Sequence, residues 1–479
     1  MRPLHAGTLS AHAARVAVPT YDRSALTPAV VHISVGSFHR SHQAVYFDDI
    51  AERRISSGWG LVGVGLHRPE MRDVLTAQDG LYTVVARGAD GDRARVIGAI
   101  RRYLFAPEQG TAVVAALADA RTRLVTLTVT AHGYASGVDS GAAPPADAVE
   151  YLVAGLDGRR RAGLPPFTVL SCDNVPDNGV VARDAVLGAA ERRDPALARW
   201  IGAYGAFPSS MVDRITPRTT PADQAFVRQR FGVADRWPVI TEPFSQWVIE
   251  DDFCAGRPPL DRVGAELVAD VRPYALTKSR LLNASHCALG HLGSLAGHLT
   301  TDRAIGDPLF DAYIAQMTAD EVTPLLPRIP GVDPAVYRAM VRARLANPKL
   351  ADQLARLCRN ASAKLPVHVL PSIAEARRAG RPHDLLTLAV AGWLRYLQSV
   401  DAHGRDLPLD DPLGDRLRAL ARAGGTDPRP VLAERVVFGD LGLDPAFASE
   451  LSAALEDIAR SGVRAAIRAR LSATDRLAA

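Results

Sequence analysis

Three residues that can carry chemistry lie close together past the middle of the chain: Lys278, Asn283 and His286. On a helix with about 100° per residue they would share an arc of roughly 140°, with a rise of about 12 Å from the lysine to the histidine. A lysine and an imidazole at that spacing would converge on a polyhydroxylated substrate between them. We therefore predict one catalytic helix over residues 272–290.

Lysine is scarce in this chain, which makes its position informative. Of 56 basic Lys and Arg residues only Lys278, Lys349 and Lys364 are lysines. Arginine does not readily release a proton, whereas lysine can act as a general base once burial or a neighbouring cation lowers its pKa. The alternative is that these lysines persist on the surface by chance, and Asn283 and His286 beside Lys278 argue against it.

Length and composition indicate a globular protein of two domains. The 479 residues are 47% hydrophobic and 23% charged, with a net charge of +4 and no basic block of the kind that binds nucleic acid. No apolar run reaches signal-peptide or membrane-span length, so we expect a cytoplasmic protein with no membrane partner. Four scattered cysteines predict reduced, mostly buried thiols and no metal site.

A dinucleotide-binding turn is predicted near the N-terminus. Residues 29–36 form a β-branched run typical of a buried parallel strand, and the turn after it would lead into a helix whose N-terminus receives a pyrophosphate. Ser34 replaces the first glycine of the usual fingerprint, and only Gly36 remains, so an ordinary strand, turn and helix stays open as an alternative. We expect Gly36, Phe38 and Arg40 to contact the cofactor.

Residues 59–66 form a second candidate strand at βαβ spacing. An acid after this strand would bind the adenosine ribose of NAD, and Glu70 can serve, but Arg68 would equally accept the 2′-phosphate of NADP. NAD is the expected cofactor, with NADP left open.

Further strands are predicted at residues 81–86, 124–130 and 167–171, and the last of these leads to Asn174. Ligands in open α/β sheets bind beyond the carboxyl ends of the strands, so Asn174 is a candidate site residue, with an Asx-turn as the alternative.

Residues 207–217 and 239–253 combine bulky apolar and acidic residues in loop-like proline contexts. After residue 268, Ala/Leu/Arg-rich helical patterns dominate, notably over residues 336–358, 383–401 and 449–471.

These patterns predict an α/β fold with a Rossmann-type domain and a mostly parallel sheet over residues 1–268. A mainly α-helical substrate domain would follow over residues 269–479.

Several motifs, in order, resemble the polyol-specific long-chain dehydrogenase/reductase family. They cover roughly residues 17 to 370 and include the following segments: Pro19-Thr-Tyr-Asp-Arg23, Val31 to Tyr46, Gln78-Asp-Gly-Leu-Tyr-Thr83, Ser171-Cys-Asp-Asn174, Met211-Val-Asp-Arg-Ile-Thr-Pro217, Thr241 to Asp251, and Lys278 to His286. The resemblance implies a metal-independent, NAD(P)-dependent oxidoreductase that interconverts a polyol and a ketose, with D-mannitol and D-fructose favoured. It also favours a monomer.

The resemblance implies a role for each matching residue. Lys278 would be the general base, and Asn283 and His286 would hold the reacting oxygen and orient the substrate. Asn174 would complete an oxyanion hole with Asn283, and Asp213 would be a site acid that we assign to both cofactor and substrate. A shared Arg-x7-Lys-Leu-Pro pattern would make two further residues bind distal hydroxyls or a carboxylate, namely Arg356 and Lys364.

The chain also departs from the family pattern at Ser34, Ala131 and Ala275, where members commonly have a glycine, a motif with a glutamate, and a glutamate, respectively. These departures keep a different class open, a nucleotide-binding sugar sensor without catalysis. Two alternatives within the family also stay open: a fructuronate (hexuronate) reductase, in which Arg356 and Lys364 would bind a carboxylate, and a D-arabinitol dehydrogenase.

Overall fold

The computed structural model describes residues 2–134, 145, 147–398, 400, 403–405 and 407–478. The chain forms two compact units, Met1–Arg272 and Pro273–Ala479. The sequence placed this boundary at residue 268.

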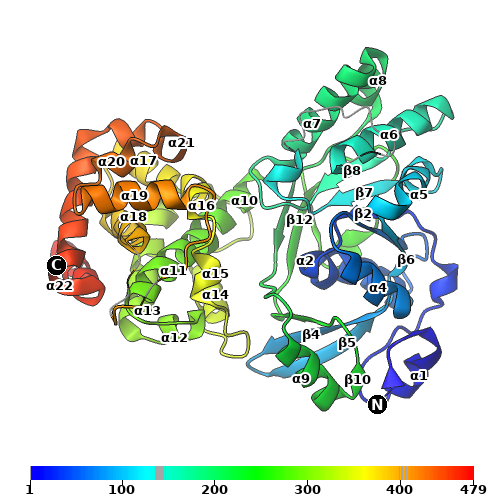
Figure 1. The fold of residues 1–479 in the computed structure, drawn as a ribbon, viewed down its shortest axis with the longest axis horizontal. Helices are drawn as coiled ribbons and strands as arrows, with labels where there is room; N and C mark the ends of the chain where they lie inside the picture. The colour runs from blue at the N-terminus through cyan, green and yellow to red at the C-terminus, as the bar shows by residue number, and fades with distance from the viewer. Residues whose placement is uncertain are drawn as a thin grey trace. The chain divides into compact units, whose positions relative to one another are not determined.

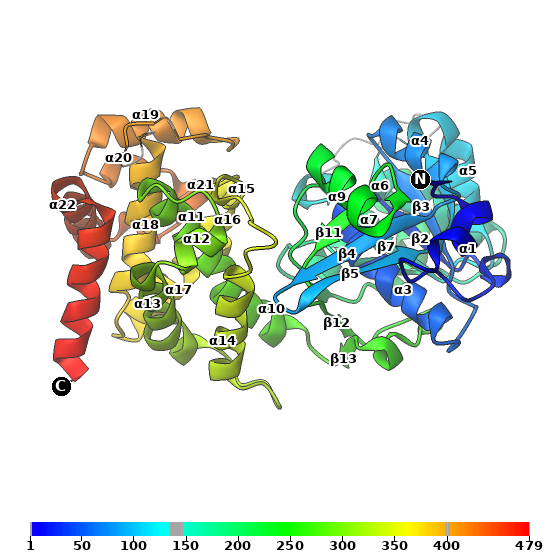
Figure 2. The same ribbon diagram turned by 90° about the horizontal axis from the view of Figure 1, so that it is seen from below.

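Unit 1 contains a five-stranded sheet in which every neighbouring pair is parallel. The strand order is β6-β3-β2-β7-β8. Figure 1 labels β6, β2, β7 and β8, and Figure 2 labels β3. The strands are β2 (Val30–Ile33), β3 (Leu61–Gly65), β6 (Ile100–Phe105), β7 (Leu124–Leu127) and β8 (Thr168–Ser171). When the five strands of this sheet are numbered 1 to 5 in chain order, their spatial order is 3-2-1-4-5, as in a Rossmann fold. This order confirms the predicted fold class. The order reverses between β2 and β7, which is where such sheets bind ligands.

The central strand β2 is buried on both faces, as its apolar composition predicted. Val31 and Ile33 belong to the apolar cluster that also contains residues of α5 (Ala106–Ala118) and α6 (Ala148–Arg161). Val30 faces the other way, into a cluster with Phe47 and Ile50 of α3 (Gln43–Glu52). Helices therefore cover both faces of the sheet, which is the doubly wound arrangement.

Three sheet segments differ from the sequence expectation. The strand expected at residues 81–86 exists as β4 (Tyr82–Gly88), but it pairs with β5 (Gly91–Ile97) and β11 (Val239–Thr241) in a separate sheet. The loop-like reading of residues 207–217 and 239–253 was wrong in part. β9 (Ser210–Asp213) and β12 (Gln246–Glu250) pair antiparallel, and Trp247 is fully buried opposite Val212. Prolines flank these short strands. Because proline is rare within strands, its presence favoured loops in the sequence interpretation.

The remaining elements of unit 1 are short strands and helices around these sheets. They are β1 (Arg2–Pro3), β10 (Val233–Ala234), β13 (Glu266–Val268), α1 (Leu9–His12), α2 (Ser37–Ser41), α4 (Pro69–Ala77), α7 (Asn178–Arg193), α8 (Pro195–Tyr204) and α9 (Pro221–Phe231).

Every named element of unit 2 within the described residues is a helix, as Figure 2 shows. The helices predicted over residues 383–401 and 449–471 correspond to α18 (Asp384–Leu397) and α22 (Pro445–Ala478). The continuous helix expected over residues 336–358 was wrong, because α14 (Pro334–Leu345) ends before Asn347-Pro348, and the short α15 (Leu354–Leu357) begins separately. Proline restricts the residue before it to non-helical conformations, which accounts for the break.

The helices of unit 2 that pack directly against α11 (Ala284–Leu295) or α18 include α12 (Thr301–Ile305), α13 (Pro308–Gln316), α16 (Ala361–His368), α17 (Leu370–Arg378) and α19 (Gly414–Gly424). The remaining helices lie beyond or beside them and include α10 (Arg272–Lys278), α20 (Arg429–Leu432) and α21 (Arg435–Phe438).

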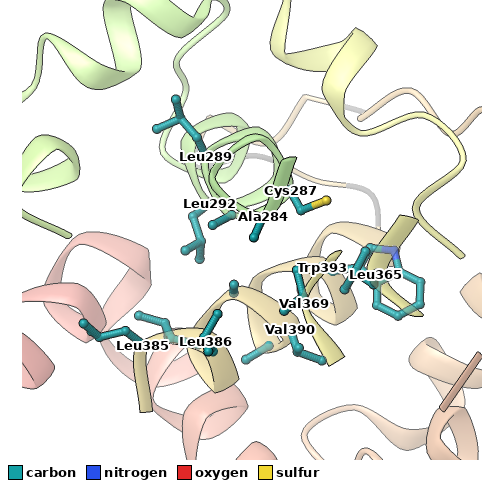
Figure 3. Close-up of a cluster of buried hydrophobic side chains, with 14 of the residues drawn as sticks. Ala284, Cys287, Leu289, Leu292, Leu365, Val369, Leu385, Leu386, Val390 and Trp393 are labelled. Atoms are coloured by element: carbon teal, nitrogen blue, oxygen red, sulfur yellow. The ribbon is translucent and has the colours of Figure 1, made fainter. Parts of the chain in front are cut away.

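The core of unit 2 holds α11 in place. Ala284, Cys287 and Leu292 point from α11 toward α18, where Val390 and Trp393 belong to the same buried cluster (Figure 3). Burying large apolar side chains contributes about 1.5–3 kcal/mol each, so α11 is a rigid base for any side chain on its other faces.

None of the described helices has the length and apolar character needed to cross a membrane.

All four cysteines are free thiols, and three of them are buried, as the sequence predicted: Cys172, Cys287 and Cys358.

Candidate active site

The turn after β2 has the backbone of a dinucleotide-binding turn despite its unusual sequence. Ser34, at the place of the first fingerprint glycine, has φ 75°, a left-handed conformation that glycine adopts at lower cost. Its backbone is held firmly, since its N–H donates to the Val64 carbonyl at 2.8 Å and its carbonyl accepts from the Thr128 hydroxyl at 2.9 Å. The chain therefore makes the tight turn without the glycine.

Gly36 follows as the N-terminal cap of α2. A Cβ atom built on Gly36 would have one described heavy atom within 4 Å, the Ser34 carbonyl oxygen at 3.9 Å. The backbone at the start of α2 is thus open to close approach, which is what a pyrophosphate requires at this point of a Rossmann fold. Together with the strand order, this arrangement fits a nicotinamide dinucleotide.

The third fingerprint position is occupied by His39, which is fully buried. Its ring stacks on His32 of β2 with the centroids 3.5 Å apart and the planes within 10°. A flat aromatic stack thus replaces the close helix-to-strand contact that a glycine would allow.

Phe38 is partly buried and stacks on His42, with centroids 4.9 Å apart. Arg40 is fully buried, lies over the Tyr82 ring and donates to the Trp237 carbonyl. These contacts describe packing, and cofactor contact by Phe38 and Arg40 stays a prediction.

Glu70 lies in the first turn of α4 and is exposed, as is Arg68, the residue that precedes α4. An acid in a first helical turn also stabilises the helix through its dipole, which is a sufficient structural reason for Glu70. Both residues are accessible to a ribose or a 2′-phosphate.

Asn174 and Asp213 follow the carboxyl ends of β8 and β9. Asp173 anchors the loop before Asn174, since its carboxylate accepts from the backbone of Val129 and Thr130 and from the Tyr134 hydroxyl at 2.6 Å. Asn174 itself is exposed, whereas Asp213 is buried and pairs with Gln246 across the sheet. Asn174 thus lies beyond the carboxyl end of a strand of the parallel sheet, where ligands bind in such folds, whereas Asp213 is the last residue of a strand in a separate sheet.

The predicted catalytic helix of unit 2 is continuous but not regular. Lys278 ends α10, a π-helical turn covers Ser279–Asn283, and α11 begins at Ala284. The wider turn changes the angular offsets calculated for an α-helix, so the expected arc of roughly 140° does not apply. Such π turns occur mostly at functional sites. Lys278 is 7% exposed and is therefore a buried amine rather than a surface lysine.

Asn283 and His286 each keep a buried polar atom without a described hydrogen-bond partner: Nδ2 of Asn283 and Nε2 of His286. Burial, and then the nearby cations Arg356 and Arg344, hold the pKa of His286 well below its usual range. The imidazole is therefore neutral at physiological pH. Buried polar groups in native proteins are nearly always satisfied, so these two atoms point to a ligand with hydroxyl or carbonyl groups.

Two glycines of α11 bring α15 close to His286. Gly290 and Gly293 lie four and seven residues after His286, on the same helix face. A Cβ atom on Gly293 would lie 2.9 Å from Leu354 Cδ1, and one on Gly290 would lie 3.1 Å from Leu357 Cβ. The absence of these Cβ atoms therefore lets α15 pack tightly against this face.

That packing brings Arg356 and Lys364 toward His286. In agreement with this, the charges of both residues lower the pKa of the histidine. Arg356 forms a bidentate ion pair with Asp352, in which Nε donates to Oδ1 at 2.6 Å. The Lys364 amine donates to the Leu357 carbonyl at 3.1 Å, and burial lowers its pKa. The structure thus brings five of the sequence-predicted residues together in unit 2: Lys278, Asn283, His286, Arg356 and Lys364.

Sequence reasoning missed Asp352 and His368. His368 Nδ1 lies 2.7 Å from the hydroxyl oxygen of Ser279, in the π turn next to Lys278. Burial, then Lys278 and Lys364, lowers the pKa of His368 to about 3. His368 follows Lys364 by four residues, so its position on the same helical face was the one available signal.

Within the described residues, no group of three or more His, Cys, Asp or Glu side chains could hold a metal ion.

Comparisons with known proteins agree with this geometry. The family description "Mannitol dehydrogenase Rossmann domain" matches residues 28–262, and "Mannitol dehydrogenase C-terminal domain" matches residues 270–459. A mannitol 2-dehydrogenase of Aspergillus terreus is 43% identical over 473 residues, covering 94% of each chain. One from Phaeosphaeria nodorum is 44% identical, covering 94% of this chain and 83% of the relative.

Two solved structures have the same fold over nearly the whole chain. The Pseudomonas fluorescens mannitol 2-dehydrogenase in ternary complex with NAD and D-mannitol gives a TM-score of 0.91 at 35% identity, covering 98% of this chain and 100% of that one. A substrate-free D-sorbitol dehydrogenase gives 0.88 at 33% identity, covering 97% and 100%. The fold, the turn after β2 and the 43% sequence identity over nearly the whole chain show that this chain belongs to the mannitol dehydrogenase family.

Proposed function

We propose that this protein is an NAD-dependent polyol:ketose oxidoreductase that interconverts D-mannitol and D-fructose, with Lys278 as the general base. The proposal is supported mainly by the buried Lys278 and by the partly buried Asn283 and His286, whose Nδ2 and Nε2 atoms are buried without a described hydrogen-bond partner. The relatives support the choice of substrate, because the similar curated proteins are named mannitol 2-dehydrogenase.

The reaction requires a proton and a hydride to leave the same carbinol group. A bound nicotinamide dinucleotide supplies the hydride acceptor. The Lys278 amine, in its unprotonated form, accepts the hydroxyl proton, and alkoxide character develops on the oxygen as the proton leaves. The Nδ2 group of Asn283 is a donor for that charge, and loss of one such donor typically costs 10²–10³ in rate.

His286 orients the substrate. Its imidazole is neutral, so one ring nitrogen donates and the other accepts, and a polyol hydroxyl can serve as the partner of either. Arg356 and Lys364 would bind distal hydroxyls. The roles of Asn174 and Asp213 stay those that the family resemblance predicts.

The turn after β2 supports NAD as the cofactor, with Gly36 at the pyrophosphate and Glu70 at the adenosine ribose. Arg68 beside Glu70 makes NADP a measurable second cofactor. We further propose that the protein acts as a monomer in the cytoplasm on a small-molecule substrate, without nucleic acid or membrane partners.

A second candidate is a hexuronate reductase, because Arg356 and Lys364 are cations that could bind a carboxylate. The test is to assay D-mannitol, D-arabinitol and D-sorbitol for oxidation, and D-fructose and D-fructuronate for reduction, each with NAD(H) and NADP(H). The proposal expects the highest kcat/KM for the mannitol and fructose pair with the unphosphorylated cofactor. Cofactor binding without turnover of any substrate would instead favour a non-catalytic sugar sensor.

A further inference from the structure

The two side chains of the ion pair between Asp352 and Arg356 differ strongly in their exposure to solvent. Asp352 is 4% exposed, whereas the Arg356 side chain keeps 40% of its exposure. Both carboxylate oxygens are used, because Oδ1 accepts from Nε and Oδ2 accepts from Nη2. The carboxylate is therefore hidden behind the guanidinium, and the guanidinium stays accessible to a ligand.

The position of Asp352 is fixed by the backbone around it. Its carbonyl accepts from the Thr301 N–H at 2.9 Å, and the next residue, Gln353, forms a β-bridge with Thr300. Asp352 precedes Arg356 by four residues at the start of α15, so the pair closes over one helical turn. A bidentate pair held this way has a defined geometry rather than a fluctuating one.

The surroundings of His286 are otherwise strongly cationic. Three positive side chains act on its ring, namely Arg356, Arg344 and Lys364, and Lys278 adds a fourth positive charge when it is protonated. A substrate with a carboxylate would be attracted to such a group of charges, whereas a neutral polyol would gain only hydrogen bonds. The balance between these two substrate classes therefore depends on how much of the positive charge is already compensated.

We propose that Asp352 is a specificity-determining residue that neutralises Arg356, so that the substrate-binding group around His286 accepts uncharged polyols and ketoses and disfavours sugar acids. This inference rests on the proposed function. It goes beyond it by naming the residue that separates the two substrate classes. Arg356 still offers Nη1 to a neutral hydroxyl, since Asp352 engages Nε and Nη2.

The test compares Asp352→Asn with a matched control. Asparagine keeps the shape and one acceptor but removes the charge. The control is Asp311→Asn, because Asp311 forms the same bidentate pair with Arg342, and neither residue belongs to the proposed substrate-binding group. For each protein we would measure kcat/KM for D-fructose and D-fructuronate, and the affinity for D-gluconate by titration calorimetry with cofactor present.

In Asp352→Asn the ratio of kcat/KM for fructuronate to that for fructose should rise about tenfold, equivalent to about 1.4 kcal/mol. D-Gluconate should bind about tenfold more tightly, and Asp311→Asn should match the wild type in both. An unchanged ratio and an unchanged gluconate affinity would overturn the inference.

Measurements on the wild-type protein distinguish failure of this inference from failure of the proposed function, and they remain possible if Asp352→Asn does not fold. Wild-type preference for fructose over fructuronate agrees with the inference, and preference for fructuronate contradicts it. Failure to turn over any polyol or ketose would refute the proposed function itself, whereas mannitol oxidation with no response to Asp352→Asn would refute only the inference.

Discussion

Asn283 and His286 show at the level of single residues why this helix is a site and not merely core. A buried donor or acceptor left without a partner costs about 1–3 kcal/mol. Nδ2 of Asn283 and Nε2 of His286 both stand in that condition within the described structure. A substrate hydroxyl or alkoxide would satisfy them, so the cost is recovered when the ligand binds.

Replacing Asn283 by alanine should therefore lower kcat for mannitol oxidation by about 10²–10³, because the donor to the developing alkoxide is lost. Affinity for NADH, followed by fluorescence titration, should stay within about twofold. A variant with wild-type kcat would show that the amide does not stabilise the transition state.

Single residues also show what sequence alone could reveal. Lys278, Asn283 and His286 were visible because their types and spacing fall within one helix. Ser34 was recognised from the position of the missing glycine, and its positive φ agrees with that place. Asp352 was not found, since its meaning depends on Gly290 and Gly293 letting α15 pack against α11, which no local pattern encodes.

At the level of elements, the π turn from Ser279 to Asn283 is the feature that a regular helix pattern could not predict. Its conformation is supported from α16, where His368 bonds the Ser279 hydroxyl. Because Lys278 immediately precedes this turn, a change in the turn would move the amine relative to Asn283. We infer that Ser279 and His368 are positioning residues.

Ser279→Ala should lower kcat about tenfold with less than a threefold change in KM, because the lysine would be displaced without loss of substrate contacts. His368→Ala should give the same split between kcat and KM. The control is Ser294→Ala, which removes a hydroxyl that contacts the Cys358 sulfur near the far end of α11, outside the π turn, and should leave kcat within twofold. Equal losses in all three variants would indicate general destabilisation instead.

The elements that the sequence mispredicted share one physical cause. The expected helix over residues 336–358 is interrupted at Asn347-Pro348, and the loops expected around β9 and β12 become strands through pairing with each other. Short segments take their conformation from tertiary partners, which local propensity does not contain.

Across the whole molecule, buried neutral histidines link stability to pH. Burial lowers the pKa of His32, His291 and His368 to about 3, and lowers those of His39 and His286 in the same direction. A histidine with a lowered folded-state pKa contributes stability above its unfolded value of about 6.5 and loses it as pH falls toward the folded value. Burial raises the pKa of Glu321 to about 7 and also raises the pKa values of Asp48, Asp173 and Asp235, and these carboxyls oppose the trend.

The free energy of unfolding should therefore fall between pH 7 and pH 5.5. The buried histidines each lose on the order of 1 kcal/mol over this window, and together their loss exceeds the gain of roughly 2 kcal/mol from Glu321, whose pKa lies inside the window. Denaturant titrations at half-unit pH steps check this. A constant or rising free energy of unfolding over that window would contradict the assignment of neutral buried imidazoles.

Whether the Lys278 amine removes the substrate proton is best tested by comparing Lys278→Ala with Lys349→Ala, since Lys349 has no role assigned in the proposed site. The account predicts that Lys278→Ala loses mannitol oxidation by at least about 10³. That variant should bind NADH within about twofold of wild type and regain part of its rate when a small primary amine is added. Lys349→Ala should keep wild-type turnover. Mannitol oxidation by Lys278→Ala at the wild-type rate would contradict the account.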